Sequence, residues 1–190
     1  MTDSPGGRAR AITDDLPAPT RHHLVLAFAS VLVAVSLLLP RPVNFAPLGA
    51  FGLFAGAYAG GRAWAYPFAA LTIYVIALGG FHWFVLGSVF LSFVGPALIG
   101  SRWLRGRVSL SRVGGSALAS STWFFVVSNL GSWVTFGVPR GEGLISHYVL
   151  GIPFFWNTLA GDVFFSAVLF GGYALVRSAS RDEPTFAREI

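Results

Sequence analysis

The sequence predicts an all-α integral membrane protein, a six-transmembrane-helix bundle with both termini cytoplasmic. Hydrophobic residues make up 54% of the 190 residues, charged residues only 11%, and the mean hydropathy is +0.67. A chain of this composition has too little polar surface to form a water-soluble globule. Its apolar stretches are long and unbroken, whereas the strands of a membrane barrel alternate apolar and polar residues, so helices are predicted.

The basic residues predict the orientation of these helices. All 13 of them are arginines, and most lie in the terminal tails or between residues 102 and 112. Positively charged residues accumulate on the cytoplasmic side of membrane proteins, and placing both termini there leaves only Arg41 and Arg140 outside. We therefore expect a multi-pass protein of the bacterial cytoplasmic (inner) membrane, with the lipid bilayer as a partner and no nucleic acid.

The chain divides into one membrane domain and two tails. Residues 1–23 are rich in Pro, Gly, Asp and Arg, and we predict that they form a disordered cytoplasmic tail. The membrane domain covers residues 24–177, and residues 178–190 form a second cytoplasmic tail. The predicted membrane helices are, in order, residues 24–39, 45–60, 64–78, 83–100, 114–136 and 152–176.

Prolines indicate where several of these helices begin and end. Pro40 ends the first helix, because proline cannot continue the backbone hydrogen-bond pattern. Asn44 is expected to cap the second helix, with Pro47 tolerated in its first turn. Pro153 suits the first turn of the last helix, which is therefore predicted to begin just before it. Pro96 is expected to kink the fourth helix.

Glycines predict one close helix contact. Gly52, Gly56 and Gly60 recur every fourth residue of the second helix and so lie on one face. A face without side chains lets another helix approach backbone to backbone, which is how lipid-embedded helices commonly pack. The second helix is therefore expected to be closely packed within the bundle.

The last helix carries the residue on which the functional hypothesis depends. Asp162 is one of only two acidic residues between Asp15 and Asp182, and its neighbours are apolar. A charge facing lipid would cost about 3 kcal/mol or more, so this carboxylate is expected to face the protein interior or a wet cavity. Thr158, Asp162 and Ser166 recur every fourth residue and share one face of the helix.

The predicted topology brings polar residues from different helices to one depth. By a rise of about 1.5 Å per residue, Asp162 lies roughly 15 Å below the outer surface and Asn129 about 10 Å below it. An apolar-walled pocket with a few converging polar groups is typical of a small-molecule site. The candidate ligand-binding residues are Asp162, Asn129, Asn157, Thr158, Trp133, Asn44 and His82.

Other interpretations of these polar residues stay open. Asn129 and Asp162 can instead hydrogen-bond each other, or nearby Ser and Thr, and so lock the fifth helix to the sixth. The aromatic residues at the outer boundary can form the interfacial belt that is common in membrane proteins. Glu142 beside Arg140 is expected to form a solvated ion pair.

Several kinds of chemistry have no signal in the sequence. The chain has no cysteine, which excludes disulfides and thiolate metal sites. His82 and His147 lie in different loops without neighbouring carboxylates, so no metal site is predicted. The sequence contains no G-x-x-x-x-G-K-[ST] phosphate loop, no H-E-x-x-H and no G-x-S-x-G. We therefore predict neither an enzyme nor a cofactor.

Three strings of residues stand out along the chain. They are NFAPLGA at residues 44–50, SNLGSW at residues 128–133 and IPFFWNTLAGD at residues 152–162. These strings resemble the N-terminal and C-terminal signatures of a family of uncharacterised bacterial integral membrane proteins. The resemblance covers about residues 44–170. Because that family has a domain of unknown function, it implies a relative without implying an activity.

The chain also resembles a second family, the substrate-binding S components of energy-coupling-factor vitamin transporters. The shared features are the predicted helix number and orientation, the outer polar layer and the missing phosphate loop. That resemblance implies ligand capture beneath the first loop, here residues 44–47, and docking of a coupling subunit served by separate ATPases. Docking uses small-x-x-x-small helix faces, for which the first helix offers only Ser30 and Ala34.

The sequence thus favours a small-solute binding or uptake component, with Asp162 binding a polar or cationic solute. The alternative is a non-transporting membrane structural or assembly protein, in which the same polar groups form interhelical hydrogen bonds. An intramembrane enzyme would need a second titrating group at the depth of Asp162, and the sequence offers none.

Overall fold

The computed structural model describes residues 18–77 and 82–179, which form helices and short connections. The α-helices are α2 (Ala18–Leu37), α3 (Leu48–Ala59), α4 (Ala65–Ala77), α5 (Trp83–Ile99), α6 (Leu110–Ser132) and α7 (Leu144–Ala179). The short helical turns are η1 (Gly60–Arg62), η2 (Gly100–Leu104), η3 (Trp133–Gly137) and η4 (Val138–Arg140). The prediction of an all-α fold is confirmed for this part of the chain, while the predicted tails largely lie outside it.

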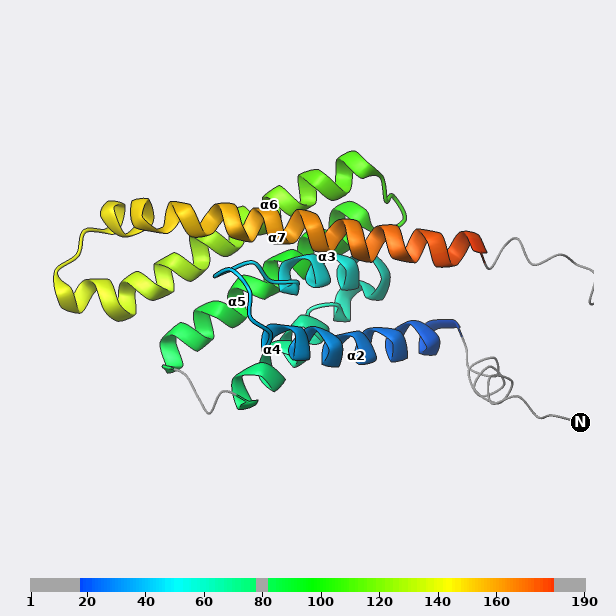
Figure 1. Ribbon diagram of the computed structural model, residues 1–190, viewed down its shortest axis with the longest axis horizontal. Coiled ribbons are helices and arrows are strands. Elements are labelled where there is room, and N and C mark those ends of the chain that lie inside the picture. The colour runs from blue at the N-terminus through cyan, green and yellow to red at the C-terminus, as the bar shows by residue number, and fades with distance from the viewer. Residues whose placement is uncertain (1–17, 78–81, 180–190) are drawn as a thin grey trace, which may run out of the picture.

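Helix α3 lies at the centre of the bundle (Figure 1). It contacts α2, α4, α5, α6 and α7, and ten of its 12 residues are buried. The long helices α6 and α7 pack along each other, and α2 packs against α4. With a rise of about 1.5 Å per residue, α3 is about 18 Å long, which is shorter than the ~30 Å hydrocarbon core of a bilayer.

The glycine face of α3 packs directly against α5 and η2. A Cβ atom added to Gly52 would lie 2.9 Å from Cβ of Pro96. A Cβ on Gly56 would collide with the carbonyl of Ala97 and lie 2.6 Å from the backbone nitrogen of Ser101. The predicted backbone-to-backbone contact is therefore confirmed for Gly52 and Gly56.

Gly60 has a different role from the one predicted for it. It follows the last residue of α3 and has a φ of 67°, in the left-handed region that favours glycine. It lies next to the guanidinium of Arg105, which a Cβ atom would approach to 2.7 Å. Gly60 therefore terminates the helix instead of extending its packing face.

Several predicted helix boundaries are wrong, and the last helix differs most. Helix α7 begins at Leu144, and Pro153 lies inside it instead of in its first turn. The preceding turn ends at Gly141, whose φ is 68°, and the carbonyl of Gly143 accepts a hydrogen bond from the backbone of His147. The helix therefore starts where the chain leaves this turn. Proline inside a helix removes one backbone hydrogen bond and crowds the carbonyl four residues earlier, and α7 continues through Pro153 despite both effects.

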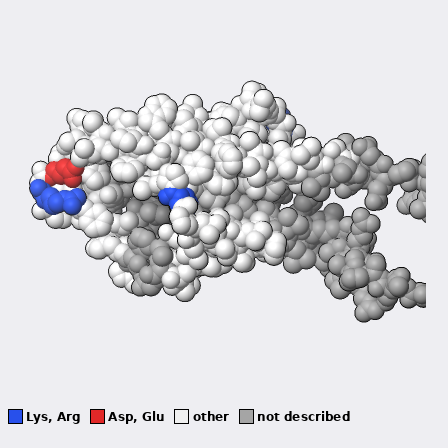
Figure 2. Space-filling model, in the orientation of Figure 1, with Lys and Arg blue, Asp and Glu red and all other residues white. Residues whose placement is uncertain are grey.

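Apolar side chains cover much of the surface. Phe28, Ile76, Trp83 and Leu150 have exposed fractions between 66% and 86%. Figure 2 shows one face of the molecule with few charged side chains, namely an acidic and a basic group at the end where α6 and α7 connect and a second basic group near the middle. Two helical stretches, Trp83–Leu104 and Leu144–Leu175, are long and apolar enough to cross a membrane.

Candidate ligand cavity

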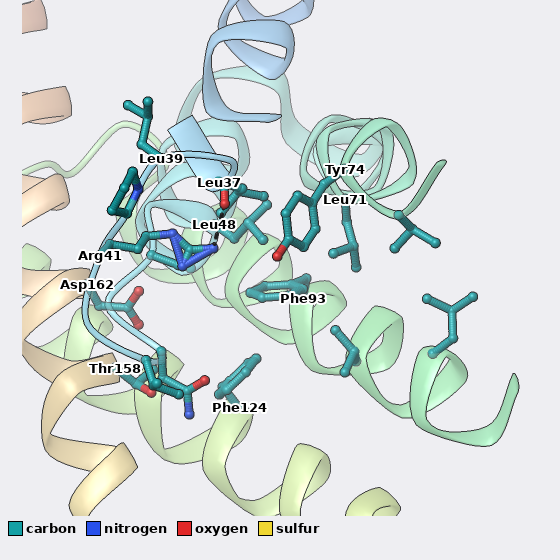
Figure 3. A pocket seen from close by; sticks show the side chains of 18 residues that line it. Leu37, Leu39, Arg41, Leu48, Leu71, Tyr74, Phe93, Phe124, Thr158 and Asp162 are labelled. Atoms are coloured by element: carbon teal, nitrogen blue, oxygen red, sulfur yellow. Dashed lines mark hydrogen bonds between the residues drawn. The ribbon is translucent and has the colours of Figure 1, made fainter. Parts of the chain in front are cut away.

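A cavity of about 510 Å³ lies between the α2–α3 loop (residues 38–47) and helices α4, α5, α6 and α7. Its apolar walls include Leu48, Leu71, Val89, Phe93 and Phe124. Its polar lining consists of Arg41, Asn44, Tyr74, Thr158 and Asp162. Figure 3 shows Arg41, Asp162 and Thr158 on one side of the cavity and Leu71 on the other. The cavity therefore has a polar end and an apolar end.

The carboxylate of Asp162 joins three helices. The side chain is 2% exposed, and its Oδ2 atom accepts hydrogen bonds from the hydroxyls of Ser120 and Ser121 on α6, at 2.9 and 2.8 Å. The backbone N–H of Ala50 in α3 forms a further hydrogen bond with the carboxylate. Asp162 itself belongs to α7, so a single side chain connects α7 with α6 and α3.

The position of the carboxylate satisfies the beginning of α3. Ala50 is in the first turn, where backbone N–H groups have no partner within the helix. Negative charge is also favoured there by the helix dipole. The prediction that Asn44 caps this helix is wrong, because the N-cap residue is Pro47 and no side chain caps from that position. The cap comes from a residue far away in the sequence.

Gly49 makes room for this carboxylate. A Cβ atom on Gly49 would overlap Oδ1 of Asp162 and lie 2.7 Å from Oδ2. Any larger residue would push the carboxylate away from the first turn of α3. Gly49 is thus required by a polar contact, whereas Gly52 and Gly56 are required by a contact between backbones.

Arg41 supplies the positive charge of the cavity. Its Nη2 atom donates to the carbonyl of Leu37, the last residue of α2, at 3.1 Å. Its Nε atom is buried and has no hydrogen-bond partner among the described residues. The ion pairs within the described ranges are Arg140–Glu142 and His147–Glu142, so Arg41 is not paired with Asp162. A buried donor of the guanidinium therefore remains free.

The residues predicted to bind a ligand fall into two groups. Asp162, Thr158 and Asn44 line the cavity, and the other four do not. Asn157 donates from Nδ2 to the carbonyl of Val43 at 3.0 Å and so fastens the loop that borders the cavity. Thr158, Asp162 and Ser166 are all buried, at 8%, 2% and 1% exposure, which confirms that they share an inward face.

The remaining three predicted residues lie elsewhere. Asn129 donates to the carbonyl of Phe125 at 2.8 Å and packs against Gly151, so it does not bond Asp162. Trp133 donates from Nε1 to the carbonyl of Glu142 at 2.9 Å. The His82 ring stacks edge-on against Phe136, with ring centroids 6.0 Å apart.

The ion pairs among the described residues form one small group outside the cavity. Arg140 lies 3.7 Å from Glu142 and is 65% exposed, as expected of a solvated pair, and Glu142 also contacts His147 at 3.2 Å. Within the described ranges, no group of three His, Cys, Asp or Glu side chains is placed to hold a metal ion.

Sequence reasoning missed Arg41, Tyr74, Ser120, Ser121 and Gly49 as parts of this site. The sequence gives Arg41 only a topological role. It names neither serine, although hydrogen bonds between Asp162 and nearby Ser or Thr of the fifth helix are one of its open interpretations, and the structure confirms that interpretation for Asp162. A signal was available for the serines, because an adjacent pair of hydroxyls in an apolar helix needs an acceptor. The proximity of Gly49 to a carboxylate on α7 has no such local signal.

The fold and the cavity define a class of protein, a helical bundle with an apolar surface around a cavity of mixed polarity. The particular family follows from the sequence, since the chain belongs to the family of unknown function DUF6580, whose pattern matches residues 18–185. Neither the comparison with curated proteins nor the comparison with solved structures finds a match.

Proposed function

We propose that this protein is a multi-pass protein of the bacterial cytoplasmic membrane that binds a small solute in the cavity beneath the α2–α3 loop. The observation that carries the proposal is the cavity itself. Its volume of about 510 Å³ is within the range of about 300–1,000 Å³ that small-molecule sites occupy. Apolar walls with a few polar groups at one end are the usual lining of such sites.

The α2–α3 loop supports a membrane setting for this cavity. Helix α3 is shorter than the hydrocarbon core, so we propose that α3 and the loop before it cross the bilayer together, with the loop at membrane depth on the outer side. Irregular backbone at that depth is tolerated only where it is buried in protein or lines a cavity. Leu39, Pro40, Arg41, Val43 and Asn44 of this loop all line the cavity.

We propose that the six helices form the membrane domain, with both termini cytoplasmic. The exposed apolar side chains and the two helical stretches that are long enough to cross support this arrangement. Most arginines then lie on the cytoplasmic side, as the positive-inside rule requires. The cavity opens beneath the first loop on the outer side, where a solute from outside has access.

A role in uptake is the extension of this proposal that the resemblance to S components suggests. The chain would then depend on a coupling subunit and ATPases supplied by other chains. The small residues that could dock such a subunit are buried against other helices of this chain. Ser30 and Ala34 are 2% and 1% exposed, and Gly52 and Gly56 pack on α5. A coupling subunit would therefore dock on another face.

The second candidate function is a structural or assembly protein without a ligand. The hydrogen bonds of Asp162 favour it, because they connect α3, α6 and α7 without any solute. In that case the cavity would be filled by lipid chains, and the polar residues would serve only to hold the helices together.

Native mass spectrometry of the protein purified in mild detergent distinguishes the two candidates. We expect the wild type to retain a small molecule that is released on unfolding. Val89→Trp, which fills the cavity, should lose this molecule while keeping its helical circular dichroism spectrum. The matched control is Val163→Trp, because Val163 is 49% exposed on the outside of α7. A wild type that carries nothing except lipid would favour the structural protein.

A further inference from the structure

We infer that the solute is a monocarboxylate with an apolar body, whose carboxylate is held by Arg41. This inference rests on the proposed function, since it names the class of molecule that occupies the cavity. It also differs from the expectation drawn from the sequence, in which Asp162 binds a cationic solute.

The first step is that Asp162 already has its partners. A carboxylate has about four positions for accepting hydrogen bonds, and Ser120, Ser121 and Ala50 occupy three of them. The side chain is also almost completely buried. A cationic solute would therefore find only one accepting position left, on a side chain that is 2% exposed.

The second step is that Arg41 has no acidic partner and keeps a buried donor without a hydrogen bond. A guanidinium presents five N–H donors in a planar fork that matches the two oxygens of a carboxylate. Here one donor, on Nη2, contacts the Leu37 carbonyl, and the buried Nε donor has no partner in the described part of the chain. In Figure 3 the guanidinium points toward the middle of the cavity lining, with Asp162 on one side and Tyr74 on the other.

The third step is that the other free polar groups also suit an anion. Asn44 and Tyr74 line the same cavity, and neither side chain has a hydrogen-bond partner among residues 18–77 and 82–179. An amide and a phenol can both donate to an oxyanion. Arg41, Asn44 and Tyr74 thus give the cavity lining three donor side chains, with Tyr74 across from Arg41 and beside Leu71 (Figure 3). The carboxylate of Asp162 already has three hydrogen-bond partners.

The fourth step concerns the charge and shape of the solute. Asp162 is close enough to line the same cavity, so a dianion such as a phosphate monoester would face a like charge. A monocarboxylate meets half of that repulsion, and Arg41 offers it one positive charge. The rest of the lining is apolar and includes Leu71, Val89 and Phe93, with Leu71 across the cavity from Arg41 (Figure 3). A carboxylate joined to an aliphatic or aromatic body therefore fits both ends of the cavity.

Isothermal titration calorimetry of the full chain in nonionic detergent tests this inference with three probes of one shape. They are phenylpropanoate, phenylpropanamide and phenylpropylammonium, which differ in the charge of the head group. We expect the carboxylate to bind at least about tenfold more tightly than the amide, because a charged hydrogen bond to Arg41 is lost in the amide. The ammonium compound should not bind.

Two variants assign the preference to Arg41. Arg41→Gln should weaken binding of phenylpropanoate by about tenfold or more and leave the amide unchanged, and Arg41→Lys should keep part of the preference. Arg140→Gln is the control, because Arg140 is an exposed arginine outside the cavity. If Arg41→Gln does not fold, Tyr74→Phe should weaken the carboxylate more than the amide.

Three outcomes would overturn the inference, and they are distinguishable from failure of the proposed function. The first is tighter binding of the ammonium compound that Asp162→Asn abolishes. The second is binding of phenylpropanoate that neither Arg41 variant changes. The third is a retained molecule without a carboxylate in the native mass spectrum, which would leave the solute-binding function standing. If no probe binds and nothing is retained, the inference and the proposed function both fall.

Discussion

The two halves of α3 are both approached very closely, but by different chemical groups. At its first turn, Gly49 lies under the carboxylate of Asp162, and Ala50 hydrogen-bonds to it. One and two turns later, Gly52 and Gly56 lie against the backbone of α5 and η2. The first contact involves a charged side chain and borders a cavity, whereas the second is a close contact between the backbones of packed helices.

The difference shows how the short helix α3 can be held inside the proposed membrane bundle. Burial from lipid provides little driving force between helices, so close van der Waals contact at the glycine face supplies the attraction. Van der Waals contact alone cannot stabilise the beginning of the helix, because the free N–H groups there require a hydrogen-bond acceptor. The carboxylate of α7 meets that requirement, and the space beside it becomes the cavity.

The largest effect is expected at the backbone contact. Gly56→Leu would place a side chain where Ala97 and Ser101 already lie, and the backbone of neither residue can rotate away. We expect a loss of stability of about 3 kcal/mol or more. Thermal unfolding in detergent, followed by circular dichroism, measures it. Gly114→Leu is the control, because a Cβ atom there meets nothing within 4 Å. Equal midpoints for the two variants would contradict the packing argument.

Removal of the carboxylate should have the next largest effect. Asp162→Ala leaves Ser120, Ser121 and the first turn of α3 without their acceptor, and we expect it to cost about 2–4 kcal/mol. Asp162→Asn keeps one acceptor oxygen and should cost less. The midpoint of thermal unfolding in the absence of any solute provides the measurement, with Glu142→Gln as the control for loss of an acidic residue. An Asp162→Ala protein as stable as the wild type would show that the three-helix junction contributes nothing.

A pair of substitutions sharpens the contrast between the two halves of α3. Gly49→Ala should cost about 1–2 kcal/mol in the wild type, because the new methyl group displaces the carboxylate. In an Asp162→Ala background the same change should cost almost nothing, since the colliding atoms are gone. The coupling between the two sites, obtained from unfolding free energies in a double-mutant cycle, is expected to be about 1 kcal/mol.

Additive costs in that cycle would show that Gly49 is needed for a reason other than Asp162. Gly52→Ala combined with Asp162→Ala serves as the matched comparison, because Gly52 contacts Pro96 and Ala97 instead of the carboxylate. Its cost should be the same with and without the aspartate.

The smallest effects are expected at the two serines that bind the carboxylate. Ser120→Ala and Ser121→Ala each remove one donor to Oδ2, and each should lower stability by about 1 kcal/mol. Ser111→Ala, at an exposed position of α6, is the control. Chemical unfolding in detergent can resolve differences of this size. A cost at only one of the two positions would indicate that one hydrogen bond dominates.

Much of this architecture follows from patterns within single helices. Composition predicted the all-α fold. A spacing of four residues between glycines predicted the packing of Gly52 and Gly56, and the same spacing between polar residues predicted the inward face that contains Asp162. Turn and cap rules were less successful, because Pro153 proved compatible with a helix interior. In each successful case the signal repeats with the helical period, so residues a few positions apart carry it.

The amino-acid sequence by itself therefore determined that the chain is helical, that α3 is closely packed and that a carboxylate on α7 faces inward. Only the tertiary structure decided which groups surround that carboxylate. Its serine partners are 42 and 41 residues away along the chain, and Arg41 reaches the same cavity from the loop before α3. The physical reason is that hydrogen-bond partners depend on how separate helices pack, and the helical period within one of them carries no information about that packing.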